Sequence, residues 1–216
     1  MGRVDSERSV PVDPSAVLWS ARAAELNQRP LLVLLHGIGA SESDLFALSP
    51  YLPLEPVIAS LRAPLPHGPG FSWYPLGNGN TGTLEVTAAA HGILDWLAAL
   101  PGNPAVALLG FSQGGAMGTQ LLRLAPDRFS CLVQLSGYAP GGHLPGDRRL
   151  AARKPPVFWG RGTLDQVIPQ EAIRHTDAWL AEHSTPTARI YEDLGHSVSA
   201  PEIGDVAAFL RQHLRP

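Results

Sequence analysis

The stretch Val106-Ala107-Leu108-Leu109-Gly110-Phe111-Ser112-Gln113-Gly114-Gly115-Ala116-Met117-Gly118 changes character in its middle. It begins as a short apolar run, breaks at Gly-Phe-Ser-Gln-Gly, and continues with small and apolar residues at helical spacing. This pattern predicts a strand that turns sharply into a helix with Ser112 at the turn, an arrangement called a nucleophile elbow. Glycines at 110 and 114 fit such a turn, because side chains there would collide with the neighbouring strand and helix. The stretch therefore indicates a serine whose hydroxyl projects from the edge of a sheet.

Apolar runs alternate with helical patterns along the rest of the chain. The run Leu31 to Leu35 is typical of a strand buried on both faces of a parallel sheet. Further strands are expected at 16–22, 57–61, 105–109, 131–135, 157–159 and 188–191, and helices at 44–49, 83–100, from 113 onward, 170–183 and 201–214. We therefore predict an α/β fold with a mostly parallel sheet of six or seven strands and helices on both faces.

The length of 216 residues and the 44% content of hydrophobic residues indicate a single domain. Residues 1–15 are expected to form a flexible N-terminal arm, since Pro11 and Pro14 interrupt regular structure, and residues 16–216 to form the domain. The net charge of −3, without a basic run, argues against nucleic acid as a partner. No apolar stretch approaches the roughly 18 residues of a membrane span, and the N-terminus lacks an apolar signal segment. A cytoplasmic protein without a membrane partner is expected.

A serine nucleophile needs a base within hydrogen-bond reach, and that base needs an orienting carboxylate. His196 directly follows the last predicted strand and is the preferred base. Asp165 follows an earlier strand, which gives the chain order serine, aspartate, histidine. Asp193 is the competing carboxylate, but its position three residues before His196 suits a cap of the local turn better. Asp165 also fits the alternative role of a helix N-cap.

Attack on a carbonyl also requires two hydrogen-bond donors for the oxyanion. The backbone N–H of Gln113 is one candidate, because the elbow fixes its position. The other lies in His36-Gly37-Ile38-Gly39, the loop after the strand 31–35, where the N–H of Ile38 is preferred. The His36 side chain is expected to pack or hydrogen-bond beneath this loop without taking a proton in catalysis. The alternative is that these glycines simply turn the chain.

Six motifs in this order resemble those of the phospholipase/carboxylesterase family of α/β-hydrolases, which includes acyl-protein thioesterases. They are His36-Gly37-Ile38-Gly39 with Asp44, Ala63-Pro64, Trp73, Gly110-Phe111-Ser112-Gln113-Gly114-Gly115, Gly160 with Asp165 and Pro169, and Gly195-His196. The resemblance covers about residues 30–214. It implies Ser112, Asp165 and His196 as a catalytic triad and Ile38 and Gln113 as oxyanion donors. It also implies hydrolysis of carboxylic esters or thioesters without a metal or organic cofactor.

The loop 63–82 is the expected place of substrate contact. Phe71, Trp73 and Tyr74 are candidates for an apolar substrate-binding wall, although aromatic residues in a loop equally often plug the core. No insertion between strands is long enough for a helical cap domain. An open groove that accepts small or slender esters is therefore expected.

These observations predict a serine esterase acting on a small-molecule ester, as a monomer or homodimer. The alternatives are an acyl thioesterase or lysophospholipase-type enzyme, and a ligand-binding protein on the same fold without turnover. Metal is not expected, because groups such as His175 with Asp177 lack further ligands at suitable spacing.

Overall fold

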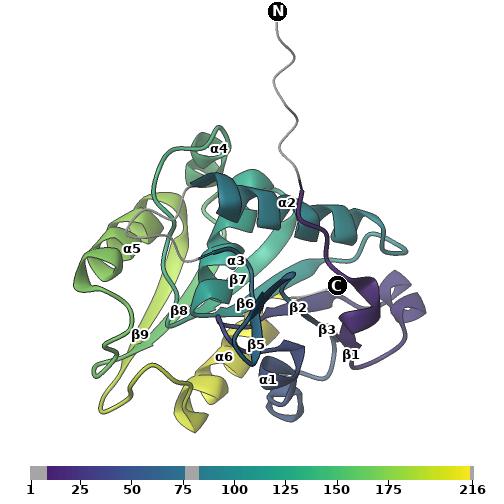
Figure 1. The fold of residues 1–216 in the computed structure, drawn as a ribbon, viewed down its shortest axis with the longest axis horizontal. Helices are drawn as coiled ribbons and strands as arrows, with labels where there is room; N and C mark the ends of the chain where they lie inside the picture. The colour runs from purple at the N-terminus through teal and green to yellow at the C-terminus, as the bar shows by residue number, and fades with distance from the viewer. Residues whose placement is uncertain (1–8, 76–82, 215–216) are drawn as a thin grey trace, which may run out of the picture.

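A mostly parallel sheet forms the centre of the protein (Figure 1). The computed structural model describes residues 9–75 and 83–214, and in this part of the chain the main sheet has seven strands in the order β1-β3-β2-β6-β7-β8-β9. The strands are β1 (Leu18–Trp19), β2 (Leu31–Leu35), β3 (Val57–Leu61), β6 (Val106–Phe111), β7 (Phe129–Leu135), β8 (Pro156–Gly162) and β9 (Thr185–Tyr191). Every neighbouring pair is parallel except β1 with β3. The predicted fold class is confirmed.

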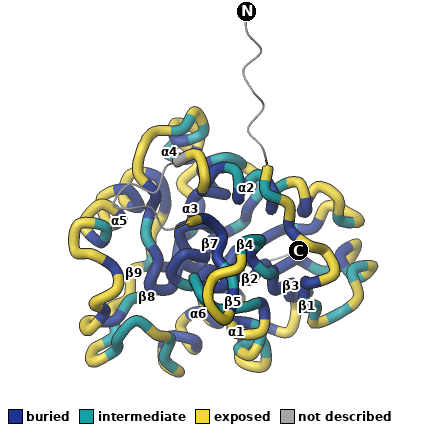
Figure 2. The backbone as a smooth tube through the Cα atoms, in the orientation of Figure 1, coloured by how far each residue is buried: buried dark blue, intermediate teal, exposed yellow. Residues whose placement is uncertain are grey.

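Helices cover both faces of this sheet (Figure 1). They are α1 (Glu42–Phe46), α2 (Thr83–Ala98), α3 (Gln113–Leu124), α4 (Asp147–Arg153), α5 (Gln170–His183) and α6 (Ala200–His213), with 3-10 turns at Pro14–Ala16, Ala23–Asn27 and Ser49–Tyr51. Successive residues of β2 face opposite cores: Val33 packs with residues of α2, α3 and α5, whereas Leu34 packs with residues of α1 and α6. Burial on both faces explains why this strand is apolar throughout. Figure 2 shows the buried central strands and the exposed outer sides of the helices.

Two elements lie in segments that the sequence predicted as loops. A hairpin of β4 (Leu65–His67) and β5 (Gly70–Ser72) forms within the predicted loop 63–82, of which residues 76–82 lie outside the described residues. Helix α4 forms in the segment 136–156, for which the sequence predicts neither a helix nor a strand. Both elements are short, and their stability depends on tertiary contacts that hydrophobic periodicity does not report.

The N-terminal segment contacts α2. The N–H of Val10 donates to the carbonyl of Ala88 at 3.0 Å, and Val12 is buried in the core. Gly92 lies in the middle of α2 because a Cβ there would be 1.7 Å from the carbonyl oxygen of Val10. This part of the predicted arm is therefore packed against the domain, while residues 1–8 of the arm lie outside the described residues. Among the described residues, no helix combines the length and apolarity needed to cross a membrane.

A buried ion pair joins the C-terminal end of α3 to α4. The Arg123 side chain is fully buried and donates to both carboxylate oxygens of Asp147, at 2.8 and 2.9 Å. It also donates to the carbonyls of Pro140 and Gly142, at 2.9 and 2.7 Å. Because each of the three guanidinium nitrogens donates to an acceptor, the burial of this charge is compensated.

The substitution Asp147→Ala is expected to lower the free energy of unfolding by about 3 kcal/mol, because it leaves a buried guanidinium without its counter-charge. The matched control is Asp127→Ala, which removes the exposed pair with Arg149 and a longer contact with Arg153 at 4.0 Å. A loss below about 1 kcal/mol is expected there. Urea unfolding followed by circular dichroism measures both values. Equal losses in the two variants would contradict this account of the buried pair.

Candidate active site

Ser112 stands between the end of β6 and the start of α3, in a backbone conformation that few non-glycine residues adopt. Its φ and ψ are 53° and −116°. A Cβ at Gly110 would lie 2.2 Å from the carbonyl oxygen of Gly114, and a Cβ at Gly114 would lie 1.8 Å from the carbonyl oxygen of Leu35. Only glycine fits at these two positions, so the sharp turn that the sequence predicts is present.

The side chains of Ser112, His196 and Asp165 form a continuous hydrogen-bonded chain. Nε2 of His196 lies 2.9 Å from Oγ of Ser112, and Nδ1 lies 2.8 Å from Oδ2 of Asp165. A carboxylate only accepts hydrogen bonds, so Nδ1 of His196 carries the proton and Nε2 accepts from the serine hydroxyl. The imidazole of His196 can therefore act as a base toward the hydroxyl of Ser112, and the carboxylate of Asp165 orients the imidazole.

The carboxyl group of Asp165 is held in its ionised form. Burial by itself would raise its pKa, but hydrogen bonds from His196 and from the N–H groups of Ile168 and Val167 outweigh that effect and keep the pKa below the ordinary value. These backbone donors lie 3.2 and 2.9 Å from Oδ1. One oxygen of Asp165 therefore caps its own turn while the other orients His196. Asp165 is not the helix N-cap considered from the sequence, because the N-cap of α5 is Pro169 and no side chain caps that helix.

The loops that carry Asp165 and His196 are joined to each other. The N–H of Leu164 donates to the carbonyl of Leu194 at 2.9 Å, and the N–H of Asp193 donates to Oγ of Thr163 at 3.0 Å. Asp193 itself is exposed and has a φ of 58°. The competing carboxylate is thus a turn residue, and the carboxylate that accepts from His196 lies on the other loop, at Asp165.

The loop after β2 lies directly beside Ser112. A Cβ on Gly37 would be 3.5 Å from Cβ of Ser112. Gly39 donates through its N–H to the carbonyl of Phe71, and the N–H of Phe71 donates to the carbonyl of Ala40, both at 2.8 Å. Strand β5 therefore braces the loop that contains Ile38. The N–H of Gln113 opens α3 and has no acceptor within the helix.

The expectation of a substrate-binding wall is wrong for Trp73 and Tyr74, whose side chains are each only 1% exposed. Nε1 of Trp73 donates to the carbonyl of His36 at 2.8 Å, and the hydroxyl of Tyr74 pairs with that of Tyr138 at 2.9 Å. Of the three predicted residues, Phe71 alone is partly exposed, and the guanidinium of Arg62 lies 4.8 Å from the centre of its ring.

The side chain of Gln113 has a role that the sequence did not reveal. Its Oε1 accepts from the N–H of Trp73 and its Nε2 donates to the carbonyl of Tyr74, both at 2.8 Å. The residue after the serine thus holds the segment that follows β5. No local pattern signals this contact, because the partners are about forty positions apart in the chain.

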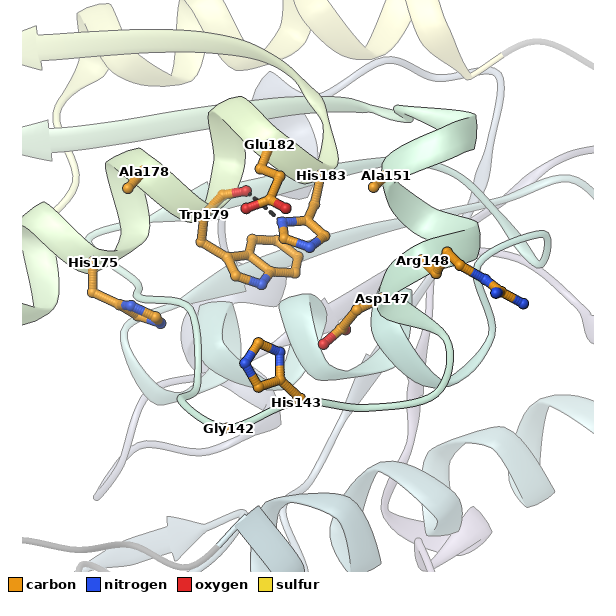
Figure 3. Close-up of a pocket in the computed structure, with 10 residues that line it drawn as sticks. All are labelled: Gly142, His143, Asp147, Arg148, Ala151, His175, Ala178, Trp179, Glu182 and His183. Atoms are coloured by element: carbon orange, nitrogen blue, oxygen red, sulfur yellow. Dashed lines mark hydrogen bonds between the residues drawn. The ribbon is translucent and has the colours of Figure 1, made fainter.

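A separate cavity of about 540 Å³ lies between α4 and α5 (Figure 3). His143, His175 and His183 line it, together with Asp147, the partner of Arg123. Arg123 is at the end of α3 remote from Ser112, and twelve helical residues span about 18 Å, so this cavity is not part of the site at Ser112. Within residues 9–75 and 83–214, no group of three or more His, Cys, Asp or Glu side chains is arranged to hold a metal ion.

Comparisons with known proteins agree on one family. The family model described as Phospholipase/Carboxylesterase matches residues 85–214. A probable carboxylesterase of Oryza sativa subsp. japonica is 28% identical over 221 residues, covering 89% of this chain and 81% of the relative. The acyl-protein thioesterase 1 of Eremothecium gossypii is also 28% identical, covering 84% of this chain and 87% of the relative.

A solved structure supports the fold. The carboxylesterase of Bacillus cereus superposes with a TM-score of 0.76, covers 91% of this chain and 93% of its own, and is 17% identical. At this level of identity the likeness speaks for the architecture alone.

Glu202 lies in the first turn of α6, the helix that follows the loop of His196. Its carboxylate and the N–H of Ser199 form one half of a capping box, and the hydroxyl of Ser199 accepts from the N–H of Glu202 as the other half. Its side chain is buried, and a Cβ on Gly160 would lie 2.1 Å from its Oε1. Burial raises the pKa of Glu202 to about 7, against the hydrogen bond from Ser199, and the charge of Asp205 adds to the increase.

The contribution of Glu202 to the free energy of unfolding is therefore expected to fall as pH rises from about 4.5 to about 7. The folded protein holds a proton on Glu202 that the unfolded chain releases at its ordinary pKa of 4.5. The stabilisation is therefore complete below the pKa of the unfolded chain, and it is lost as pH rises through the folded-state pKa of about 7. The variant Glu202→Gln keeps an N3 residue suited to a capping box and removes the titration. We expect it to flatten this pH dependence and to be more stable than the wild type at pH 8, by up to about 3 kcal/mol. Chemical unfolding at several pH values tests this, and parallel profiles for the two proteins would contradict it.

Proposed function

The chain belongs to the phospholipase/carboxylesterase family, and from that premise we propose that it is a serine hydrolase that cleaves carboxylic esters through an acyl-enzyme intermediate. The observation that carries the proposal is the hydrogen-bonded chain from Ser112 through His196 to Asp165. A serine nucleophile requires a base within hydrogen-bond reach and a carboxylate that orients that base, whereas a serine with a structural role requires neither. Here the base lies 2.9 Å from the hydroxyl, and a buried carboxylate orients it.

In the proposed first half-reaction, Oγ of Ser112 attacks the carbonyl carbon of the ester while Nε2 of His196 takes the hydroxyl proton. The carbonyl π electrons move to oxygen, and the N–H groups of Ile38 and Gln113 receive the oxyanion. When the tetrahedral intermediate collapses, the bond to the alcohol oxygen breaks and His196 returns its proton to that oxygen. The acyl group remains on Ser112.

The second half-reaction repeats these steps with water. His196 takes a proton from the attacking water, a second oxyanion forms between the same N–H groups, and the acid leaves as Ser112 regains its proton. Asp165 stays ionised throughout and stabilises the imidazolium that forms twice per turnover. The depressed pKa of Asp165 suits this role, since the carboxylate must persist beside a cation.

We propose small or slender esters as the substrates. Ser112 is 7% exposed and His196 is 16% exposed at its side chain, so the reacting atoms lie just below the surface. In the described part of the chain no helical cap stands over them. The side chains of Leu164 and Val167 are exposed on the loop of Asp165, and we propose them as apolar contacts for the substrate.

We expect Ser112→Ala to abolish hydrolysis of p-nitrophenyl esters and labelling by a fluorophosphonate. Asp165→Asn should reduce kcat by about 10³- to 10⁴-fold while the protein stays folded, because the imidazole loses its orientation and its counter-charge. Asp193→Asn is the matched control and should change kcat by less than about twofold, since Asp193 is an exposed turn residue. Equal hydrolysis by the wild type and Ser112→Ala would refute the mechanism, and a folded wild type that no fluorophosphonate labels would favour a ligand-binding protein without turnover.

Thioester cleavage is the second candidate, and the similarity to an acyl-protein thioesterase over most of both chains favours it. The same triad attacks either carbonyl, so the acyl and leaving groups decide the preference. Rates measured on an oxygen ester and a thioester with the same acyl chain, at several chain lengths, separate the two. We expect a higher kcat/KM for the oxygen ester with short chains, and a preference for the long-chain thioester would assign the protein to the thioesterases.

A further inference from the structure

Both ring nitrogens of His36 are engaged in hydrogen bonds that fix the tautomer of the ring. The N–H of Ala63 donates to Nε2 at 3.1 Å, so Nε2 carries no proton. A neutral imidazole has one donor and one acceptor, and Nδ1 is therefore the donor in the 2.7 Å contact with the carbonyl oxygen of Gly37.

The residues around His36 favour a neutral ring. His36 is fully buried, and burial lowers its pKa below the ordinary histidine value. The charge of Arg62 acts in the same direction, whereas the hydrogen bond to Gly37 and the carboxylates of Asp44 and Glu42 act against it. A second proton would also place an N–H on Nε2, facing the N–H of Ala63.

The carbonyl that accepts from His36 belongs to the same peptide unit as the N–H of Ile38. The peptide unit is planar and trans, so its C=O and N–H point in opposite directions. A bond that holds the carbonyl of Gly37 toward the buried ring therefore directs the N–H of Ile38 away from it. Hydrogen bonding at the carbonyl also polarises the unit and makes its N–H a stronger donor.

This peptide unit borders the reacting atoms. Gly37 is close enough to Ser112 that its missing Cβ would contact that of the serine, at 3.5 Å. Its other neighbours are also fixed: Nε1 of Trp73 holds the preceding carbonyl, of His36, and Gly39 is paired to Phe71. Two donors act on the Gly37–Ile38 unit itself: the N–H of Ala40 lies 3.3 Å from the carbonyl oxygen of Gly37, and Nδ1 of His36 lies closer to it, at 2.7 Å.

We propose that His36 is a positioning residue of the oxyanion hole, which uses its Nδ1–H to orient and polarise the Gly37–Ile38 peptide unit so that Ile38 donates to the transition-state oxyanion. The proposal rests on the proposed function and specifies how one of its two donors is held. It predicts that the two hydrogen bonds of His36 differ in consequence: the one to Gly37 serves turnover, and the one from Ala63 serves only to anchor the ring.

Two amide variants separate these bonds. In His36→Asn the side-chain amide N–H occupies the place of Nδ1 and keeps the donor to Gly37, whereas in His36→Gln the side-chain oxygen occupies the place of Nε2 and keeps the acceptor for Ala63. We expect His36→Gln to lower kcat for p-nitrophenyl butyrate by about tenfold to hundredfold with KM within twofold, as expected for an interaction made in the transition state. In His36→Asn, kcat should stay within about threefold of the wild-type value.

Thermal unfolding and infrared spectroscopy complete the experiment. Each variant loses one buried hydrogen bond, so a merely structural role would lower Tm and kcat similarly in both, and that result would overturn the proposal. In a stably acylated Ser112, the acyl carbonyl stretch should shift to higher frequency in His36→Gln alone, because a weaker donor polarises the carbonyl less. If His36→Gln does not fold, His36→Asn decides: retention of kcat supports the proposal, and a hundredfold loss in folded protein overturns it.

Failure of the proposed function has a different signature. A wild type that neither turns over esters nor reacts with a fluorophosphonate would remove the function and this inference together. A wild type that does both, with kcat equal in the two His36 variants, would overturn the inference alone.

Discussion

The contact between the first turn of α3 and the ends of β2 and β6 is the constraint on which the rest of the site depends. At Gly114 the helix approaches the carbonyl of Leu35 so closely that no side chain fits, and at Gly110 the strand meets the helix in the same way. This contact fixes Ser112 at φ 53°, with its N–H bonded to the carbonyl of Leu135 of the neighbouring strand. The conformational cost of such a backbone, of order 1–3 kcal/mol, is met by the packing of the elements around it.

The remaining groups reach Ser112 on loops that are held in pairs. The loops carrying Asp165 and His196 exchange hydrogen bonds through Leu164 and Thr163, so the carboxylate and the imidazole are positioned as one unit. On the other side, β5 braces the loop of Ile38, and the side chain of Gln113 holds the segment after β5. Both halves of the site are thus held in place by hydrogen bonds within the protein, and such preorganisation is the condition for electrostatic stabilisation without reorganisation.

The buried ionisable side chains of this protein differ in how well hydrogen-bond partners compensate their burial. Arg123 is buried at the far end of α3 with a full set of acceptors, and Asp165 is buried with three donors that hold its pKa below the ordinary value. Glu202 is buried with an oxygen that finds no partner among the described residues, and its pKa is raised accordingly. His36 is a third case. Its buried ring is neutral, because each of its two nitrogens has a hydrogen-bond partner in a single tautomer.

The sequence by itself determined the features that depend on neighbours in the chain. Apolar runs and helical periodicity predicted the alternating elements, the glycines around Ser112 predicted the elbow, and strand ends predicted that Asp165 and His196 meet the serine at one edge, because parallel strands present their carboxyl ends together. Tertiary structure alone decided that Trp73 and Tyr74 are buried, that Gln113 holds their backbone, and that the hairpin at 65–72 and α4 form. These features depend on contacts between residues that lie tens of positions apart, and such contacts leave no periodic trace in the chain that would reveal them.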